Sequence, residues 1–284
     1  MTEVSTISAK AKLAGIVGWP VSHSLSPRLH GFWLQHHKID GAYVPLPVHP
    51  DNLEQALRAL PNMGFRGVNL TVPHKRAAVD VVDEISDIGR RIGAVNTVFI
   101  GDGGRLSATN TDGAGFLANL HEGAPNWGAD ARPAVVLGAG GAARAILVSL
   151  IDAGVPEIRL LNRTRARAEE MADAFGPKIK VYDWGDRDNT LDGAGLLVNT
   201  TTLGMSGQPP LEIALDALPG TAVVTDLVYA PLETDLLAAA RQRYLTAVDG
   251  LGMLLHQAVP GFEGWFGVRP EVSSRLRRYV LENA

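Results

Sequence analysis

Two apolar runs, and the polar segments that follow them, constrain this chain more than any other feature. Residues 134–137 lead into Gly138, Gly140 and Gly141, and an apolar helical pattern begins after them. This order predicts a strand, a tight glycine turn and a helix N-terminus, which is the arrangement that holds the pyrophosphate of a dinucleotide. Glycines also serve ordinary turns, so the turn alone is a weak signal. The flanking strand and helix favour a nucleotide-binding α/β domain of the Rossmann type.

The end of the second apolar run indicates which dinucleotide is bound. Residues 158–161 are followed by Asn162 and three arginines, and Thr164 has the character of a helix N-cap. NAD-binding proteins usually place an acid here, which holds the ribose 2′-hydroxyl. Arg165 and Arg167 would instead lie in the first turn of a helix, where the helix dipole disfavours cations. A solvated helix face is the plainer interpretation, but a bound 2′-phosphate explains the arginines better. The sequence therefore predicts NADP as cofactor.

Composition narrows the class of protein. The 284 residues are enough for two domains. The net charge of −4 does not indicate a binding surface for nucleic acid or an anionic membrane. The absence of cysteine excludes disulfides and thiolate metal sites, and the eight histidines show no metal-ligand spacing. No apolar run approaches transmembrane length. We expect a cytoplasmic soluble protein without a metal and without nucleic-acid or membrane partners.

Strands and helices alternate along the chain, which predicts α/β architecture with mainly parallel sheets. Strands are expected at residues 12–17, 43–48, 67–72, 94–100, 134–137, 158–161, 196–199, 223–227 and 245–248. Asp51 and Glu54 have the spacing of a capping box before a helix. Residues 121–133, rich in Gly, Ala and Pro, are the best candidate for a domain boundary. The closing residues 251–284 are expected to be helical.

Polar residues follow two of the strands in the first half. Ser24 and Ser26 lie two apart in a loop after the first strand, where paired hydroxyls suit a polyol or a carboxylate. The alternative is that Ser26 only caps the helix that begins near Pro27. Physical reasoning leaves both interpretations open.

A lysine and an aspartate offer acid–base chemistry. Asn69 and Thr71 alternate with apolar residues at the end of a strand, and Lys75 starts the helix that follows. Asp112, at the start of a later helix, could hold the ammonium of Lys75. Carbonyl reduction needs such a proton donor, because the oxygen gains charge as hydride reaches carbon. A surface lysine and an N-cap aspartate are the common alternative.

Together these motifs resemble the shikimate dehydrogenase family, NADP-dependent enzymes that reduce 3-dehydroshikimate to shikimate on the way to chorismate and the aromatic amino acids. The resemblance covers nearly the whole length. It rests on Gly18-x-Pro20-x-x-His23-Ser24-x-Ser26-Pro27-x-x-His30, Asn69-x-Thr71-x-Pro73-x-Lys75, Gly93–Thr97, Asn110–Gly113, Gly138–Ala143, Asn162-Arg163-Thr164-x-x-Arg167, Asn199-x-Thr201-x-x-Gly204-Met205, Asp226-x-x-Tyr229-x-Pro231 and Asp249-Gly250-x-Gly252-Met253-Leu254-x-x-Gln257-Ala258.

The resemblance implies a role for each matching position. Lys75 and Asp112 would be the catalytic pair. Shikimate would be bound by Ser24, Ser26, Thr71, Asn96, Asp112, Tyr229 and Gln257, with Asn69 in support. NADP would be bound by Gly138, Ala139, Gly140, Gly141, Ala142, Asn162, Arg163, Thr164, Arg167, Leu227, Gly250 and Met253, with Asp87 a weaker candidate.

The resemblance also implies the domain organisation. Residues 1–112 and 249–284 would form an α/β substrate-binding and catalytic domain with a mainly parallel sheet, and residues 113–248 a Rossmann-type NADP domain. The cleft between the domains would hold substrate against cofactor and exclude water on closing. The enzyme would act on a small molecule as a monomer or a homodimer.

Two other functions compete with this one. A relative that uses quinate or NAD would be expected to alter the serine pair or to carry an acid at position 162. A non-catalytic NADP sensor would have no need of a proton donor such as Lys75. The serines, Asn162 and Lys75 all favour shikimate with NADP.

Overall fold

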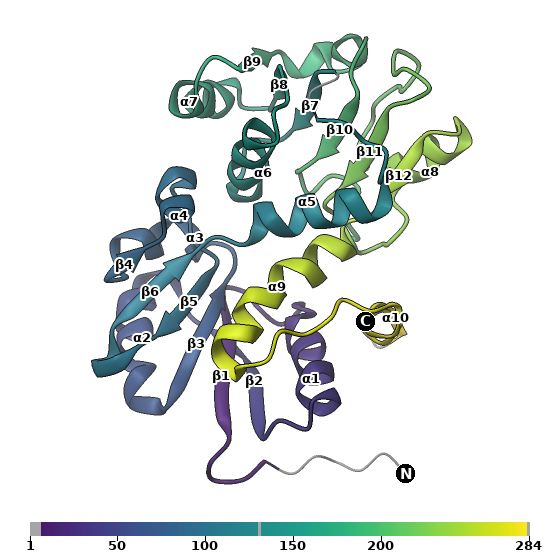
Figure 1. The fold of residues 1–284 in the computed structure, drawn as a ribbon. Helices are drawn as coiled ribbons and strands as arrows, with labels where there is room; N and C mark the ends of the chain where they lie inside the picture. Colours follow the sequence, from purple (N-terminus) through teal and green to yellow (C-terminus); the bar gives the residue numbers. More distant parts are fainter. Residues whose placement is uncertain (1–6, 130–131, 283–284) are drawn as a thin grey trace. The chain divides into compact units, whose positions relative to one another are not determined.

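The computed structural model describes residues 7–129 and 132–282, and the chain divides into two compact units (Figure 1). The first unit comprises Met1–Thr111 and Leu255–Ala284, and the second comprises Asp112–Leu254. Two parts of the sequence-based predictions lie outside the described residues: positions 130–131 of the expected boundary segment and positions 283–284 of the expected helical end. The assignment of substrate and cofactor roles to domains stays a prediction.

A six-stranded sheet with the order β2-β1-β3-β5-β6-β4 forms the first unit. Its strands are β1 (Lys12–Gly18), β2 (Gly41–Pro47), β3 (Phe65–Leu70), β4 (Glu84–Ile85), β5 (Thr97–Ile100) and β6 (Leu106–Thr109). β1 pairs in parallel with β2 and β3, whereas β5 runs antiparallel to β3 and β6. The connection of five residues between β5 and β6 is long enough for a hairpin but too short for a parallel crossover.

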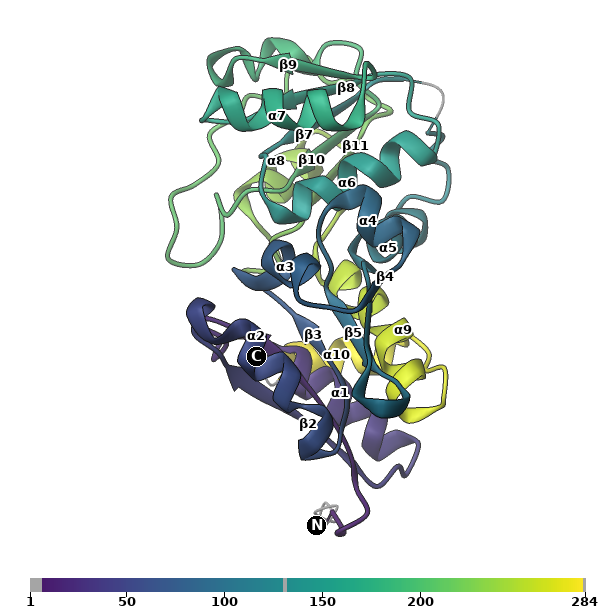
Figure 2. The same ribbon diagram turned by 90° about the vertical axis from the view of Figure 1, so that its left-hand side faces the viewer.

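Helices cover both faces of this sheet (Figures 1 and 2). The helices of this unit are α1 (Ser26–His36), α2 (Leu53–Ala59), α3 (His74–Ala77), α4 (Asp87–Ile92), the part of α9 (Leu251–Phe266) from Leu255 onward, and α10 (Ser274–Glu282). Leu57 of α2 packs with Val68 of β3 in one core cluster. On α9, Trp265 donates a hydrogen bond from Nε1 to the Val98 carbonyl at 3.0 Å. It thereby lies over Gly67, where a Cβ would come within 2.2 Å of Trp265 Nε1.

The second unit is built on a parallel sheet with the order β12-β11-β10-β7-β8-β9. Its strands are β7 (Ala134–Leu137), β8 (Ile158–Leu161), β9 (Ile179–Tyr182), β10 (Leu196–Asn199), β11 (Val223–Asp226) and β12 (Thr246–Val248). Its helices are α5 (Asp112–Gly123), α6 (Gly141–Asp152), α7 (Arg165–Phe175), α8 (Asp235–Gln242) and the beginning of α9. The parallel pairing and this strand order confirm the predicted Rossmann-type α/β fold.

Alternation along the strands fixes which helices cover each face of the second sheet. Val136 of β7 packs in a cluster with residues of α5, α6 and α7. Its neighbours Val135 and Leu137 pack instead in a cluster that includes α8. Because successive side chains of a strand point to opposite faces, the continuous apolar run of β7 is buried on both sides.

The predicted capping box is wrong. Residues 50–52 form a 3₁₀ turn, so α2 begins at Leu53 and Asn52 occupies its N-cap without a side-chain capping bond. Asp51 lies inside the turn, where its backbone N–H donates to the His49 side chain at 3.4 Å. Leu53 and Leu57 of this helix are both buried.

Candidate active site

The loop between β1 and α1 carries the two predicted serines. Ser26 is the buried first residue of α1, and Leu25 before it holds the N-cap position with no capping bond. The alternative that Ser26 only caps this helix is therefore wrong. Ser24 Oγ accepts a hydrogen bond from the Ser26 backbone N–H at 3.3 Å, which keeps the two serines in one turn. Their contact with substrate stays a prediction.

Asn69 and Thr71 mark the end of β3, and the structure gives them different surroundings. Asn69 is buried, accepts a hydrogen bond on Oδ1 from the Tyr43 hydroxyl at 2.6 Å, and donates from Nδ2 to the Asn96 carbonyl and Thr97 Oγ1. Thr71 is half-buried, and its hydroxyl has no hydrogen-bond partner among the described residues. Asn69 therefore acts as an internal anchor of the strand end, while Thr71 can offer its hydroxyl to a ligand.

The structure brings Asn96 and Gln257 together from positions 161 residues apart. Asn96 Nδ2 donates to Gln257 Oε1 at 3.2 Å and to Thr111 Oγ1 at 3.0 Å. The Thr111 hydroxyl donates to the Gln257 carbonyl at 2.8 Å, and the Thr111 N–H donates to Asn96 Oδ1 at 2.9 Å. Thr111 thus joins the two predicted substrate residues, and the sequence reasoning gave it no role.

The proposed acid–base residues lie on short, well-anchored segments. Lys75 is half-buried in α3, and its carbonyl accepts the N–H of Val95 at 2.8 Å, next to Asn96. Asp112 is the buried first residue of α5, directly after Thr111. Lys75 belongs to the first unit and Asp112 begins the second. Their action as a pair stays a prediction.

The glycine turn has the features that a pyrophosphate site needs. Gly138 has φ +107°, and a Cβ there would lie 2.6 Å from Thr200 Oγ1, so the turn depends on this glycine. α6 begins at Gly141, with Gly140 at the N-cap and no capping side chain. A Cβ at either of these two glycines would meet nothing within 4 Å. The N-terminus of α6 is therefore open, with backbone N–H groups available to an anion.

Asn162 connects the glycine turn with the next helix. Its Oδ1 accepts the Ala139 N–H at 3.1 Å, and its Nδ2 donates to the Thr164 carbonyl at 2.8 Å. Thr164 does occupy the N-cap of α7, as predicted, but makes no capping hydrogen bond. The Asn162 amide therefore fixes the shape of the segment after β8, where NAD-binding proteins usually carry an acidic residue.

The arginines after β8 divide into two kinds. Arg165 Nε donates to Glu169 Oε1 and Nη1 donates to Asp183 Oδ1, both at 2.7 Å. The argument that Arg165 indicates a bound anion is therefore wrong, since the protein's own carboxylates neutralise it. Arg163 and Arg167 are exposed and form no ion pair within the described part of the chain. Those two guanidinium groups are the ones that can meet a 2′-phosphate.

Three residues that the resemblance assigns to NADP gather around the loop after β11: Leu227, Gly250 and Met253. A Cβ on Gly250 would lie 2.3 Å from the Leu227 carbonyl, so these two segments are in close contact. Met253 and Leu227 are both half-buried against the same core cluster. Tyr229 is half-buried too, burial raises its pKa above the ordinary value, and its hydroxyl has no hydrogen-bond partner among the described residues. Asp87 is different: it is an exposed residue at the start of α4 in the first unit.

Sequence reasoning missed a buried polar pair at the ends of β10 and β11. Asn199 Nδ2 donates to Asp226 Oδ1 at 2.9 Å, and both residues are buried. The Asp226 carboxylate also accepts the Val228 N–H at 3.0 Å and the Thr234 hydroxyl at 2.8 Å. Burial nevertheless raises the pKa of Asp226 to about 6. Both residues stood in the motifs, but only their adjacent strands show that they meet.

The raised pKa of Asp226 predicts a pH dependence of stability. A carboxyl whose pKa is about 6 when folded and near 3.9 when unfolded favours folding below pH 4, and this contribution is lost as the pH rises through about 6. The unfolding free energy of Asp226→Asn minus that of wild type should increase by about 2 kcal/mol as the pH rises from 4.5 to 8. Urea unfolding of both proteins across this range would measure the difference, and parallel curves would contradict the prediction.

The comparison with Asp226→Asn is needed because a histidine acts in the opposite direction. Burial lowers the pKa of His30 to about 3, so His30 favours folding at high pH and loses this contribution as the pH falls below about 6.5. The wild-type profile alone sums both effects. The difference between the two proteins isolates Asp226.

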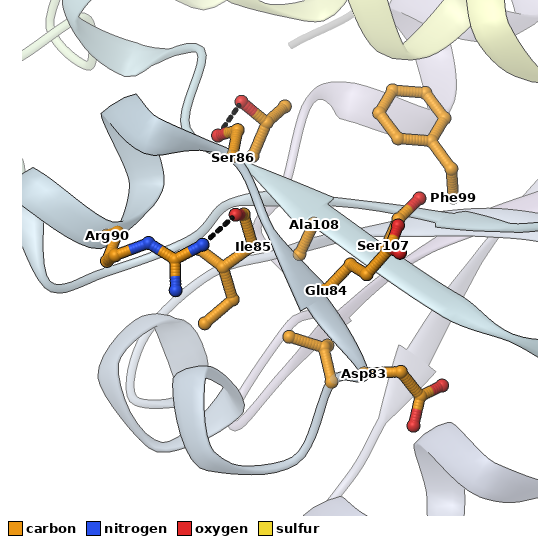
Figure 3. Close-up of a pocket in the computed structure, with 10 residues that line it drawn as sticks. Asp83, Glu84, Ile85, Ser86, Arg90, Phe99, Ser107 and Ala108 are labelled. Carbon is orange, nitrogen blue, oxygen red and sulfur yellow. Dashed lines mark hydrogen bonds between the residues drawn. The ribbon is translucent and has the colours of Figure 1, made fainter.

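A separate groove of about 590 Å³ lies along β4 and β6 in the first unit (Figure 3). Ser86 Oγ hydrogen-bonds Thr109 Oγ1 at 2.7 Å, and Arg90 Nη2 donates to the Ile85 carbonyl at 2.9 Å. None of the predicted catalytic, substrate or cofactor residues lines it. The candidate site therefore lies elsewhere.

Residues 7–129 and 132–282 contain no group of three or more His, Asp or Glu side chains placed to hold a metal ion. Across the same residues, no helix is both long and apolar enough to cross a membrane.

Two family models match parts of this chain. Residues 16–98 match the family model described as the shikimate dehydrogenase substrate binding domain, and residues 126–204 match that of shikimate / quinate 5-dehydrogenase. The shikimate dehydrogenase (NADP(+)) of Paramagnetospirillum magneticum is 59% identical over 97% of this chain and 100% of its own length.

Solved structures similar to this chain include a shikimate dehydrogenase and a quinate dehydrogenase. Shikimate 5-dehydrogenase from Thermus thermophilus, in complex with NADP(H) and shikimate, is 36% identical and superposes with a TM-score of 0.85 over 96% of this chain and 100% of its own. Quinate dehydrogenase from Corynebacterium glutamicum, in complex with NAD, is 31% identical with a TM-score of 0.89, over 96% and 99% of the two chains. With these matches over nearly its whole length, the chain belongs to the shikimate dehydrogenase family.

Proposed function

We propose that this chain catalyses the NADP-dependent interconversion of 3-dehydroshikimate and shikimate, a step toward chorismate and the aromatic amino acids. The observation that carries this function is the 59% identity, over 97% of the chain, to a shikimate dehydrogenase named for NADP(+). Arg163 and Arg167, exposed and without an ion pair among the described residues, support the same cofactor, because a 2′-phosphate is the group that separates NADP from NAD.

The first unit supplies most of the groups that we assign to shikimate. Ser24 and Ser26 follow β1, Thr71 follows β3, and Asn96 is hydrogen-bonded to Gln257. Hydroxyl and amide groups of this kind match the hydroxyls and carboxylate of shikimate in hydrogen-bonding character. From the second unit, Tyr229 adds a phenol hydroxyl without a protein partner among the described residues.

Lys75 and Asp112 are assigned the proton transfer. In the direction of reduction, Lys75 Nζ donates a proton to the carbonyl oxygen as negative charge develops there. In the direction of oxidation, the neutral Lys75 amine takes the proton of the reacting hydroxyl. The buried Asp112 carboxylate stabilises the ammonium form and orients it.

The second unit supplies the groups that we assign to NADP, which accepts or delivers the hydride when bound. The N–H groups of Gly140, Gly141 and Ala142 at the open end of α6 would hold the pyrophosphate. Arg163 and Arg167 would hold the 2′-phosphate. The close contact between Gly250 and Leu227 would form the surface against which the nicotinamide lies.

Initial rates with three substrate pairs test this function. We expect shikimate with NADP to react much faster than quinate with NADP and than shikimate with NAD. Comparable rates with NAD would show that the arginine argument is wrong, and preference for quinate would point to the quinate relative. Binding of NADP without turnover of either acid would instead indicate a sensor.

We also propose that the enzyme acts in the cytoplasm, as a monomer or a homodimer. The net charge of −4 supports the absence of a nucleic-acid partner. Light scattering on the purified protein would decide its oligomeric state.

A further inference from the structure

The last residues of β10 and β11 form a polar pair that the proposed reaction does not use. Asn199 and Asp226 are direct neighbours in the parallel ladder, at the carboxyl ends of β10 and β11. Their exposed fractions are 0% and 1%. A buried polar side chain is costly unless its hydrogen bonds are made, so the bonds of this pair identify what it holds in place.

Asn199 is fully bonded and organises the loop after β10. Its Nδ2 donates to Asp226 Oδ1 at 2.9 Å and to the Leu203 carbonyl at 3.1 Å. Its Oδ1 accepts from both the backbone N–H and the hydroxyl of Thr201, at 3.0 and 2.7 Å. All four hydrogen-bonding positions of the amide are therefore used within the protein.

Asp226 closes the loop after β11, which carries Tyr229. One carboxylate oxygen accepts the Val228 N–H at 3.0 Å, and the other accepts the Thr234 hydroxyl at 2.8 Å. Thr234 is also the N-cap of α8, where its side chain accepts the Leu237 N–H. The carboxylate therefore ties the start of residues 227–234 to their end, with Tyr229 between the two attachment points.

Two more contacts join this loop to its neighbours. The Ser206 N–H donates to the Ala230 carbonyl at 2.8 Å, which links the loop after β10 to the residue next to Tyr229. The Thr200 hydroxyl donates to the Leu137 carbonyl at 2.8 Å, at the start of the glycine turn. Three successive loops at the carboxyl ends of β7, β10 and β11 are thus connected, and the Asn199–Asp226 pair lies at their centre.

The choice of a carboxylate follows from the donors around it. An amide, a backbone N–H and a hydroxyl all point hydrogens at Asp226, and no ion pair to it exists among the described residues. Only an ionised carboxylate offers acceptors on both oxygens and no hydrogen of its own. The arrangement keeps a buried charge without a cation, which favours a positioning role over a contribution to stability.

We propose that Asp226 and Asn199 form a positioning pair that holds the 227–234 loop in the conformation in which Tyr229 binds shikimate. This proposal rests on the proposed function, since it gives Tyr229 its role through that substrate. Asp226 itself acts only through the loop and does not contact the reacting atoms.

A double-mutant cycle between Asp226 and Tyr229 tests the proposal in the full-length enzyme. We expect Asp226→Ala to raise the KM for shikimate about 10-fold, to leave kcat within about 3-fold, and to leave the Kd for NADP within about 3-fold. Tyr229→Phe should raise the same KM. The KM of the double variant should be no higher than the KM of the more impaired single variant, because the loop acts through Tyr229. Asp226→Asn, which keeps one oxygen as acceptor but replaces the other with an NH₂ donor, should give a KM between those of wild type and Asp226→Ala.

Two further variants serve as a control for Asp226→Ala and as its replacement. Asp235→Ala removes an exposed carboxylate on the helix that follows the loop and should leave the KM for shikimate unchanged. If Asp226→Ala fails to fold, as judged by thermal unfolding, the near-isosteric Thr234→Val replaces it in the cycle, with an expected KM increase of about 3-fold.

An unchanged KM for shikimate in the folded Asp226 or Thr234 variant would overturn the proposal. So would a double variant whose increase in KM equals the product of the increases in the two single variants. An unchanged KM in Tyr229→Phe would overturn it as well. All three require a wild type that oxidises shikimate with NADP. Failure of the proposed function would appear earlier, as an inactive wild type.

Discussion

Replacing Lys75 with alanine should lower kcat for shikimate oxidation by about 10²- to 10⁴-fold, the range that positioned acid–base groups contribute. The Kd for NADP should stay within about 2-fold, because Lys75 belongs to the first unit and the residues assigned to the 2′-phosphate belong to the second. The carbonyl of residue 75 would still accept the Val95 N–H, so α3 should keep its place. Steady-state rates and a fluorescence titration with NADPH would measure the two quantities.

The neighbouring arginine provides the control. Arg76 is an exposed cation in the same short helix, and Arg76→Ala should leave kcat unchanged. The assignment of Lys75 would be wrong if Lys75→Ala lost NADP affinity while turnover per bound enzyme stayed intact. An equal loss of kcat in both variants would show that α3, and not the lysine, is what the reaction needs.

The double variant Arg163→Ala/Arg167→Ala should raise the KM for NADP about 100-fold. Hydrogen bonds to charged groups contribute about 1.5–3 kcal/mol each, and exposure of both arginines places the sum toward the lower end. The KM for NAD should change little, because NAD has no 2′-phosphate. Rates with both cofactors at fixed ionic strength would measure the shift in preference.

Arg165→Ala is the matched control for this pair. Its guanidinium group is bonded to Glu169 and Asp183, so its loss should change the KM for NADP by less than about 3-fold. Equal effects on NADP and NAD in the double variant would contradict a 2′-phosphate role. A larger effect from Arg165→Ala than from the pair would reverse the assignment.

The Rossmann-type unit could be predicted because its signals are local. A strand buried on both faces, such as β7, reads as a continuous apolar run, and the glycine turn follows it directly in the chain. The same local reasoning failed for Arg165 and Asp51. The place of Arg165 in the first turn of α7 determines how its charge interacts with the helix dipole. It does not show that Asp183, 18 residues away, neutralises Arg165.

Periodicity and spacing could not predict which of the other site residues contact one another, because these contacts are long-range. No periodicity reports that Asn96 meets Gln257 or that Asn199 meets Asp226, since each pair joins segments that only the folded sheet brings together. The short strand β6 was missed for a related reason. Its sequence, Leu-Ser-Ala-Thr, is too short and too polar to predict a strand, and its hairpin with β5 is what fixes it.

The return of the chain to the first unit has a consequence for synthesis on the ribosome. The second unit is one continuous segment, whereas the first needs α9 from Leu255 onward, including the Trp265 indole over Gly67 and the Gln257 amide beside Asn96. Domains generally fold as units while the chain emerges. Here the first unit, although its first segment is translated before the second unit, has to wait for the segment from Leu255 onward, so its polar site matures only after the whole second unit has been translated.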